Sequence, residues 1–122
     1  MEIKISPDGA KNCLVTLSGF ISKDFPIREI LSFRNLLGQP KAVRIDSAFW
    51  LIQEKMGFNL WWWAEEPTIA FPMESRNFAD FEKLQSLHAP KGATGLGLSS
   101  FKGPGSGDKE MSFLIILELI KQ

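Results

Sequence analysis

With 122 residues, the chain has the length of one domain, and we expect residues 1–122 to fold as a single unit. Its 14 lysine and arginine residues balance 14 aspartate and glutamate residues, which argues against nucleic-acid binding and against attachment to anionic membranes by charge. The only cysteine, Cys13, excludes an intrachain disulfide, and no apolar run reaches the roughly 18 residues of a membrane span. The sequence therefore predicts a soluble, cytoplasmic protein.

The first third of the chain predicts a β-hairpin followed by a helix. Residues 2–6 and 13–21 alternate apolar and polar side chains on either side of a Pro-Asp-Gly turn at residues 7–9, which is typical of paired strands. Residues 26–37 then repeat apolar side chains three and four positions apart, with Asp24 in position for an N-cap and a glycine directly after the segment. We therefore predict a helix over residues 26–37.

Residues 47–56 are compatible with two structures. One is a helix that ends at a glycine, because the Gln-Glu-Lys-Met run at residues 53–56 has good helix propensity. The other is a strand that turns over residues 54–57 and returns along residues 58–64. We favour this hairpin, because the Phe-Trp-Leu-Ile run at residues 49–52 is aromatic and branched, as strands prefer.

The predicted hairpin divides the aromatic residues between two faces. Its register pairs Leu51 with Leu60, and places Phe49, Leu51, Leu60 and Trp62 in the main core together with Val43 and Ile45. The opposite face then carries Trp50, Trp61 and Trp63. Three roles stay open for this second face: burial under another layer of the monomer, a subunit interface, or a ligand surface.

The rest of the chain predicts further strands and a second helix. Residues 78–88 place apolar side chains at every third position, which favours a helix, with a strand over residues 81–87 as the alternative. Residues 111–120 are apolar on both faces, which is typical of a central strand. Together these patterns predict an α+β fold: a largely antiparallel sheet of six to eight strands, with helices at residues 26–37 and 78–88.

No motif points to a cofactor, a metal ion or a catalytic group. The Gly-Pro-Gly-Ser-Gly-Asp-Lys run at residues 103–109 lacks the Gly-Lys-Ser/Thr of a phosphate-binding loop and predicts a flexible loop instead. His88 is the only histidine, so with a single cysteine the usual zinc ligands are missing. We predict no cofactor, no metal site and no catalytic residue, with His88 at the surface and Cys13 as a small buried side chain.

Acidic residues follow the tryptophan run. Glu65 and Glu66 come directly after it, and Glu74 and Arg76 follow the next predicted strand. A carboxylate beside indole rings can bind a sugar or a cation, and two carboxylates can do acid–base chemistry. A solvated acidic rim is the alternative. These four residues, with Trp50, Trp61 and Trp63, form the predicted binding surface.

The opening of the chain resembles that of anti-sigma-factor antagonist domains. The likeness lies in the predicted order strand–strand–helix–strand over residues 2–46, which includes Leu-Ser-Gly at residues 17–19 and Val-Arg-Ile-Asp at residues 43–46. It covers about a third of the chain. Those domains continue with a phosphorylatable serine ahead of a Gly-Leu helix, whereas Ser47 precedes Ala-Phe-Trp. A phosphorylation switch would require Ser47 at an exposed helix N-terminus.

Two functions follow from these patterns. The first is a small non-enzymatic protein that self-associates, as a dimer, or binds another protein through an aromatic sheet face, without nucleic acid or membrane as a partner. The second is a small-ligand-binding protein or enzyme with a tryptophan-lined pocket and acidic residues, which requires those side chains to converge on one cavity.

Overall fold

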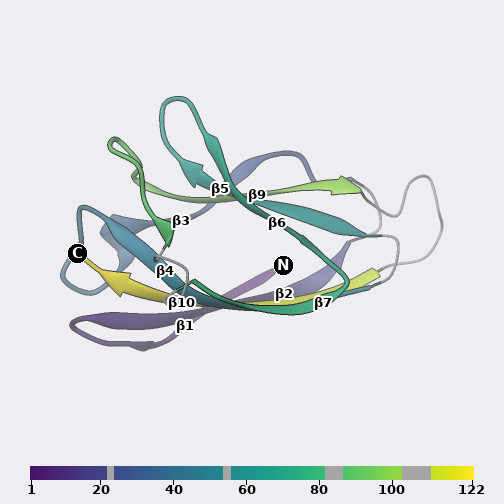
Figure 1. Ribbon diagram of the computed structural model, residues 1–122, viewed down its shortest axis with the longest axis horizontal. Helices are drawn as coiled ribbons and strands as arrows, with labels where there is room; N and C mark the ends of the chain where they lie inside the picture. Colours follow the sequence, from purple (N-terminus) through teal and green to yellow (C-terminus); the bar gives the residue numbers. More distant parts are fainter. Residues whose placement is uncertain (22–23, 54–55, 82–86, 103–110) are drawn as a thin grey trace.

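The computed structural model describes residues 1–21, 24–53, 56–81, 87–102 and 111–122. These residues form two antiparallel sheets that face each other as the layers of a sandwich (Figure 1). Sheet A has the strand order β1-β2-β10-β4-β7, with β8 paired to β4, and sheet B has the order β3-β9-β5-β6. The bounds are β1 Glu2–Asp8, β2 Asn12–Ile21, β3 Arg28–Ser32, β4 Val43–Ile52, β5 Gly57–Trp63, β6 Thr68–Glu74, β7 Arg76–Asp80, β8 Leu87–His88, β9 Gly95–Lys102 and β10 Met111–Lys121, with a 3-10 turn, η1, at Phe33–Asn35.

The α+β prediction is wrong, and the predicted helix at residues 26–37 is one reason. This segment forms β3 and then η1. Strand β3 pairs with β9, and a bulge between Glu29 and Leu31 breaks its alternation. Leu31 and Phe33 are both buried, whereas Ile27 and Leu37 are exposed. A bulged strand therefore produced the apolar spacing of a helix, and pairing with β9 overrode the local propensity.

The predicted helix at residues 78–88 is also wrong over its described part. Its start belongs to β7 and its end is β8, and both strands pair with β4. Phe78 lies opposite Phe49 across this edge of sheet A. Residues 82–86, like the predicted loop at residues 103–109, lie outside the described residues.

Several strand predictions are confirmed. Strands β1 and β2 form the predicted hairpin, with Ile3 opposite Leu17 and Ile5 opposite Val15. Residues 47–52 are strand rather than helix. Strand β10 lies between β2 and β4, in the middle of sheet A, which satisfies the hydrogen bonds on both of its edges.

The predicted pairing of β4 with β5 is wrong, because these two strands belong to opposite sheets. Trp50 lies opposite Ile115 of β10, and Trp61 lies opposite Gly97 of β9. The chain therefore passes from one layer of the sandwich to the other between β4 and β5. Alternation identified both strands, but it contains no information about which neighbour each strand pairs with.

Alternate side chains of both sheets meet in one core. From sheet A, β10 contributes Phe113, Ile115, Leu117 and Leu119, and from sheet B, β5 contributes Phe58, Leu60 and Trp62; all are buried. The rings of Phe58 and Phe113 lie 4.9 Å apart and join the two layers. Burying each of these side chains stabilises the fold by about 1.5–3 kcal/mol.

Candidate functional site

Strand β4 contains the bulge that decides which residues reach the surface. Ser47 lies opposite Glu118 and Ile45 lies opposite Leu119, so Asp46 is an extra residue in β4. Asp46 is buried and its Oδ1 lies 2.9 Å from Nε of Arg44. An extra residue reverses the side on which all later side chains stand. Beyond this bulge the predicted faces of β4 are therefore exchanged.

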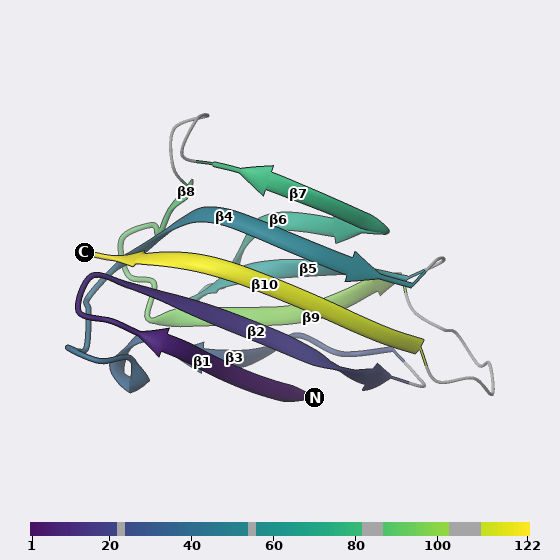
Figure 2. The ribbon, with the colours of Figure 1, turned by 90° about the horizontal axis from the view of Figure 1, so that it is seen from below.

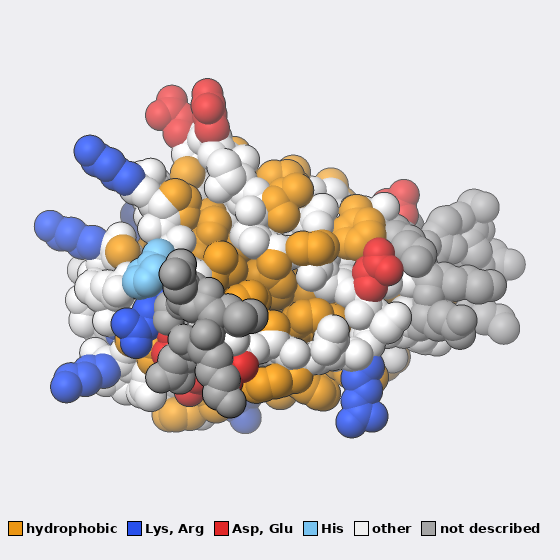
Figure 3. Space-filling view, in the orientation of Figure 1, with side chains coloured by type: hydrophobic (Ala, Val, Ile, Leu, Met, Phe, Trp, Pro, Cys, Tyr) orange, Lys and Arg blue, Asp and Glu red, His pale blue; other side chains and the backbone are white. Residues whose placement is uncertain are grey.

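Trp50 consequently points into the core rather than onto an outer face. It is 7% exposed, its Nε1 donates to the carbonyl oxygen of Glu74 at 3.0 Å, and its ring lies 5.9 Å from that of Phe71. The ring centroids of Phe71 and Phe81 lie 5.0 Å apart. Figure 3 shows apolar side chains between the two layers on this side of the molecule, where β6 and β7 form the sheet edges.

Trp61 and Trp63 do share a face, the outer surface of sheet B. Both are half-buried, and across the sheet Trp61 lies opposite Gly97 and Trp63 opposite Gly95 of β9. A Cβ atom on Gly97 would lie 2.8 Å from Cε3 of Trp63, and Nε1 of Trp61 donates to Oγ of Ser99 at 2.8 Å. Gly97 thus leaves room for the ring of Trp63.

The four charged residues of the predicted site do not converge. Glu65 and Glu66 lie in the turn between β5 and β6, whereas Glu74 ends β6 and Arg76 begins β7 in the other sheet. Because β6 has seven residues, the two ends of this hairpin lie roughly 20 Å apart. The structure therefore brings together only Trp61 and Trp63 among the tryptophans, and separates Glu65 and Glu66 from Glu74.

The outer surface of sheet A carries an apolar patch that the sequence interpretation missed. We call it the outer apolar face and define it by five side chains: Phe49, Leu51, Phe78, Leu114 and Ile116. Leu51 is 47% exposed and Phe78 is 59% exposed, and the other three are half-buried. Figure 2 shows this side of sheet A without any described element in front of it.

Register places these five side chains beside one another. Leu51 of β4 lies opposite Leu114 of β10, and Phe49 lies opposite both Ile116 of β10 and Phe78 of β7. Residues directly opposite on one face of antiparallel strands have Cβ atoms about 4.5–5.5 Å apart. The outer apolar face is therefore continuous across three strands. A hollow of about 340 Å³ lies at one end of it, lined by Leu51, Gln53, Ser112, Phe113 and Leu114.

Polar side chains border the outer apolar face. Thr16 and Ser18 of β2 lie opposite Ile116 and Leu114, and Arg76 of β7 lies opposite Leu51. Glu118 and Ser47 lie opposite each other at its end toward the bulge. An apolar centre with a polar rim is the usual composition of a protein interface.

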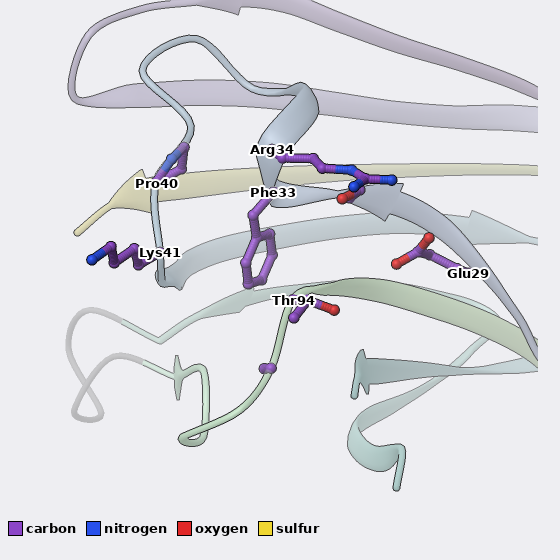
Figure 4. A pocket seen from close by; sticks show the side chains of 8 residues that line it. Glu29, Phe33, Arg34, Pro40, Lys41 and Thr94 are labelled. Carbon is purple, nitrogen blue, oxygen red and sulfur yellow. The ribbon is translucent and has the colours of Figure 1, made fainter. Parts of the chain in front are cut away.

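A separate pocket opens at one end of the sandwich. It has a volume of about 490 Å³, and its lining includes Glu29 and Arg34 on one side and Lys41 on the other, with Phe33 and Thr94 between them (Figure 4). None of its lining residues is tryptophan or one of the acidic residues of the predicted site. This cavity is therefore not the tryptophan-lined pocket that the second hypothesis requires.

Ser47 and Cys13 both lie within strands of sheet A. Ser47 lies within β4, and its Oγ donates to Oε1 of Glu118 at 3.3 Å. The phosphorylation switch implied by the resemblance needs a helix N-terminus at this serine. The position of Ser47 within a strand excludes it. Cys13 is buried, as predicted, and burial raises the pKa of its thiol above the ordinary value of 9.0.

The C-terminal strand is fixed by a half-buried ion pair. Nζ of Lys121 lies 2.5 Å from Oδ1 of Asp8, and it also donates to the carbonyl oxygens of Gly9 and Leu37 at 2.6 and 2.8 Å. The hydrogen bond from Lys121 lowers the pKa of Asp8 below its ordinary value of 3.8, against the opposing effect of partial burial.

This ion pair predicts a loss of stability in acid. A carboxylate with a lowered pKa in the folded state stabilises the fold above its unfolded pKa, and this contribution is lost as the pH falls below about 4. Lys121→Ala should lower the free energy of unfolding by about 2 kcal/mol at pH 7 and flatten the pH dependence below pH 4. Urea denaturation across this pH range measures the free energy of unfolding, and Lys91→Ala, at an exposed lysine, is the control. Equal losses of stability in the two variants would contradict the stabilising role of the ion pair.

Metal sites and membrane spans are not found in the described part of the chain. Its His, Cys, Asp and Glu side chains form no group of three that could hold a metal ion. It also contains no helix long and apolar enough to cross a membrane. Comparison with protein-family models, with curated proteins and with solved structures found no match to this chain.

Proposed function

We propose that this chain is a non-enzymatic protein that self-associates as a dimer through the outer apolar face. The observation that carries the proposal is the continuity of Phe49, Leu51, Phe78, Leu114 and Ile116 on a sheet surface that no described element covers. Apolar patches of this kind, rimmed by polar residues, mark protein interaction sites. A second copy supplies the same apolar surface, so a twofold contact covers both patches at once.

The size of the surface suits a dimer. Strands β2 and β4 each have ten residues. Together with β10, which lies between them and has eleven residues, these strands offer roughly 500 Å² in flat projection, at about 4.8 Å between strands. Protruding side chains enlarge the accessible area beyond this value, and a stable dimer uses about 800 Å² of each partner. Two flat sheets can also pack face to face as sheets do within a sandwich.

The compartment that we propose is the cytoplasm. The support is that Cys13 is the one cysteine of the sequence and is buried, and a single cysteine cannot form a disulfide within the chain. Self-association in this compartment needs no covalent link between copies.

Leu51→Asp tests the proposed function, with Ile69→Asp as its matched control. Leu51 is 47% exposed and Ile69 is 51% exposed, and they lie on strands of opposite sheets. A symmetric dimer contains two copies of each substitution, and moving a carboxylate from water into an apolar contact is unfavourable even with Arg76 opposite it. We expect Leu51→Asp to weaken dimerisation at least about 100-fold, and Ile69→Asp to leave it unchanged.

Sedimentation velocity over a micromolar concentration range measures this effect, with circular dichroism to confirm that both variants fold. A wild-type chain that stays monomeric would contradict self-association. Equal weakening by the two substitutions would contradict the choice of the outer apolar face.

A further inference from the structure

Glu118 is the charged residue that β10 places beside the outer apolar face. It stands on the same side of β10 as Leu114 and Ile116, and Ile120 follows it on that side. Its neighbours across the sheet are Leu14 of β2 and Ser47 of β4. Its direct partners across the sheet are thus one apolar residue and one serine, and Arg44, which lies opposite Ile120, is the cation of β4 on this side of the sheet.

Ser47 is the hydrogen-bond donor that the structure gives to this carboxylate. Its Oγ lies 3.3 Å from Oε1 of Glu118, and Glu118 is half-buried. One hydroxyl donor satisfies only part of a carboxylate, which has about four acceptor positions. Water supplies the remaining hydrogen bonds while this side of the sheet is open.

We infer that Glu118 limits the strength of self-association, an inference that rests on the proposed function. A second copy that covers Ile116 also covers its sequence neighbours on the same side of β10, and so removes water from the Glu118 carboxylate. Removing water from a carboxylate without a cation beside it is unfavourable. Arg44, the nearest arginine along β4, is already paired with Asp46 at 2.9 Å. Glu118 therefore keeps the dimer weaker than its apolar contacts alone would make it.

Glu118→Gln separates the charge from the shape of the side chain. Glutamine has nearly the same size, and its amide oxygen still accepts the hydrogen bond from Ser47. We expect the dimer dissociation constant to fall about ten-fold or more, because each dimer contains two copies of Glu118. Glu66→Gln is the matched control: Glu66 is an exposed carboxylate in the β5–β6 turn, and its replacement should not change the dissociation constant.

Ser47→Ala provides a second measurement. It removes the donor that partly satisfies the carboxylate, so it should weaken the wild-type dimer several-fold. In the Glu118→Gln background the same substitution should have a smaller effect, because an uncharged amide loses less when its partner is removed. All four dissociation constants come from sedimentation equilibrium.

The outcomes distinguish this inference from the proposed function. Tighter dimerisation by Glu118→Gln, with no change in Glu66→Gln, supports the inference. Unchanged or weaker dimerisation by Glu118→Gln overturns it, because the partner then leaves Glu118 in water or supplies a cation to it, while the proposed function stands. If both wild type and Glu118→Gln remain monomeric, the inference and the proposed function fail together.

Discussion

Trp50→Ala should lower the free energy of unfolding by about 3–5 kcal/mol, the usual range for removing a large aromatic side chain from a core. Trp50 is 7% exposed and contacts Phe71, and its loss also leaves the carbonyl oxygen of Glu74 without its indole donor. The substitution therefore combines a cavity with an unsatisfied acceptor.

Trp63→Ala is the matched control for this prediction. Trp63 is half-buried on the outer surface of sheet B, so its removal leaves no closed cavity, and we expect a loss of about 1–2 kcal/mol. Urea denaturation of both variants at one protein concentration gives the comparison, since self-association shifts the apparent stability with concentration. Equal losses for Trp50→Ala and Trp63→Ala would contradict the burial of Trp50 in the core and the outer position of Trp63.

Gly95→Ala should be the most damaging substitution among the glycines that the structure describes, with a loss of about 3 kcal/mol. A Cβ atom on Gly95 would collide with the carbonyl oxygen of Leu31, which belongs to the backbone of β3. Strands β3 and β9 would have to separate to admit it. The neighbouring position differs, because a Cβ atom on Gly97 first meets the side chain of Trp63.

A double substitution separates these two cases. Trp63→Ala should recover part of the stability lost in Gly97→Ala, because it removes the ring that the new methyl group contacts. Trp63→Ala should recover none of the stability lost in Gly95→Ala, because the new methyl group there meets the backbone carbonyl oxygen of Leu31. Urea denaturation measures all five variants. A Gly95→Ala protein within about 0.5 kcal/mol of wild type would show that β3 and β9 are not as close as described.

Alternation along the sequence was sufficient to find most strands but not their partners. It identified the β1–β2 hairpin, because a Pro-Asp-Gly turn separates two alternating runs, and it identified β10 as central, because both of its faces are apolar. The pairing of β4 with β10 joins residues about 70 positions apart, as Ser47 and Glu118 show. Nothing local specifies such a contact.

Two bulges explain the largest errors. In β3, the bulge between Glu29 and Leu31 gave a strand the apolar spacing of a helix. In β4, the extra residue Asp46 reversed the faces, so that Phe49 and Leu51 were assigned to the core and Trp50 to the surface. In the alternation of Val43 and Ile45 with Arg44, Asp46 occupies a solvent-facing position, so no local pattern marks this bulge, and its burial is seen only in the structure.

The most direct test of self-association through the outer apolar face is a dilution series followed by methyl NMR of the isoleucine side chains. Ile116 lies on the outer apolar face, and Ile69 lies on the outer surface of sheet B. We predict that the methyl signals of Ile116 change between millimolar and micromolar protein, as the dimer dissociates, while those of Ile69 stay constant. Signals of Ile116 that do not change with concentration, or changes confined to Ile69, would contradict the proposed function.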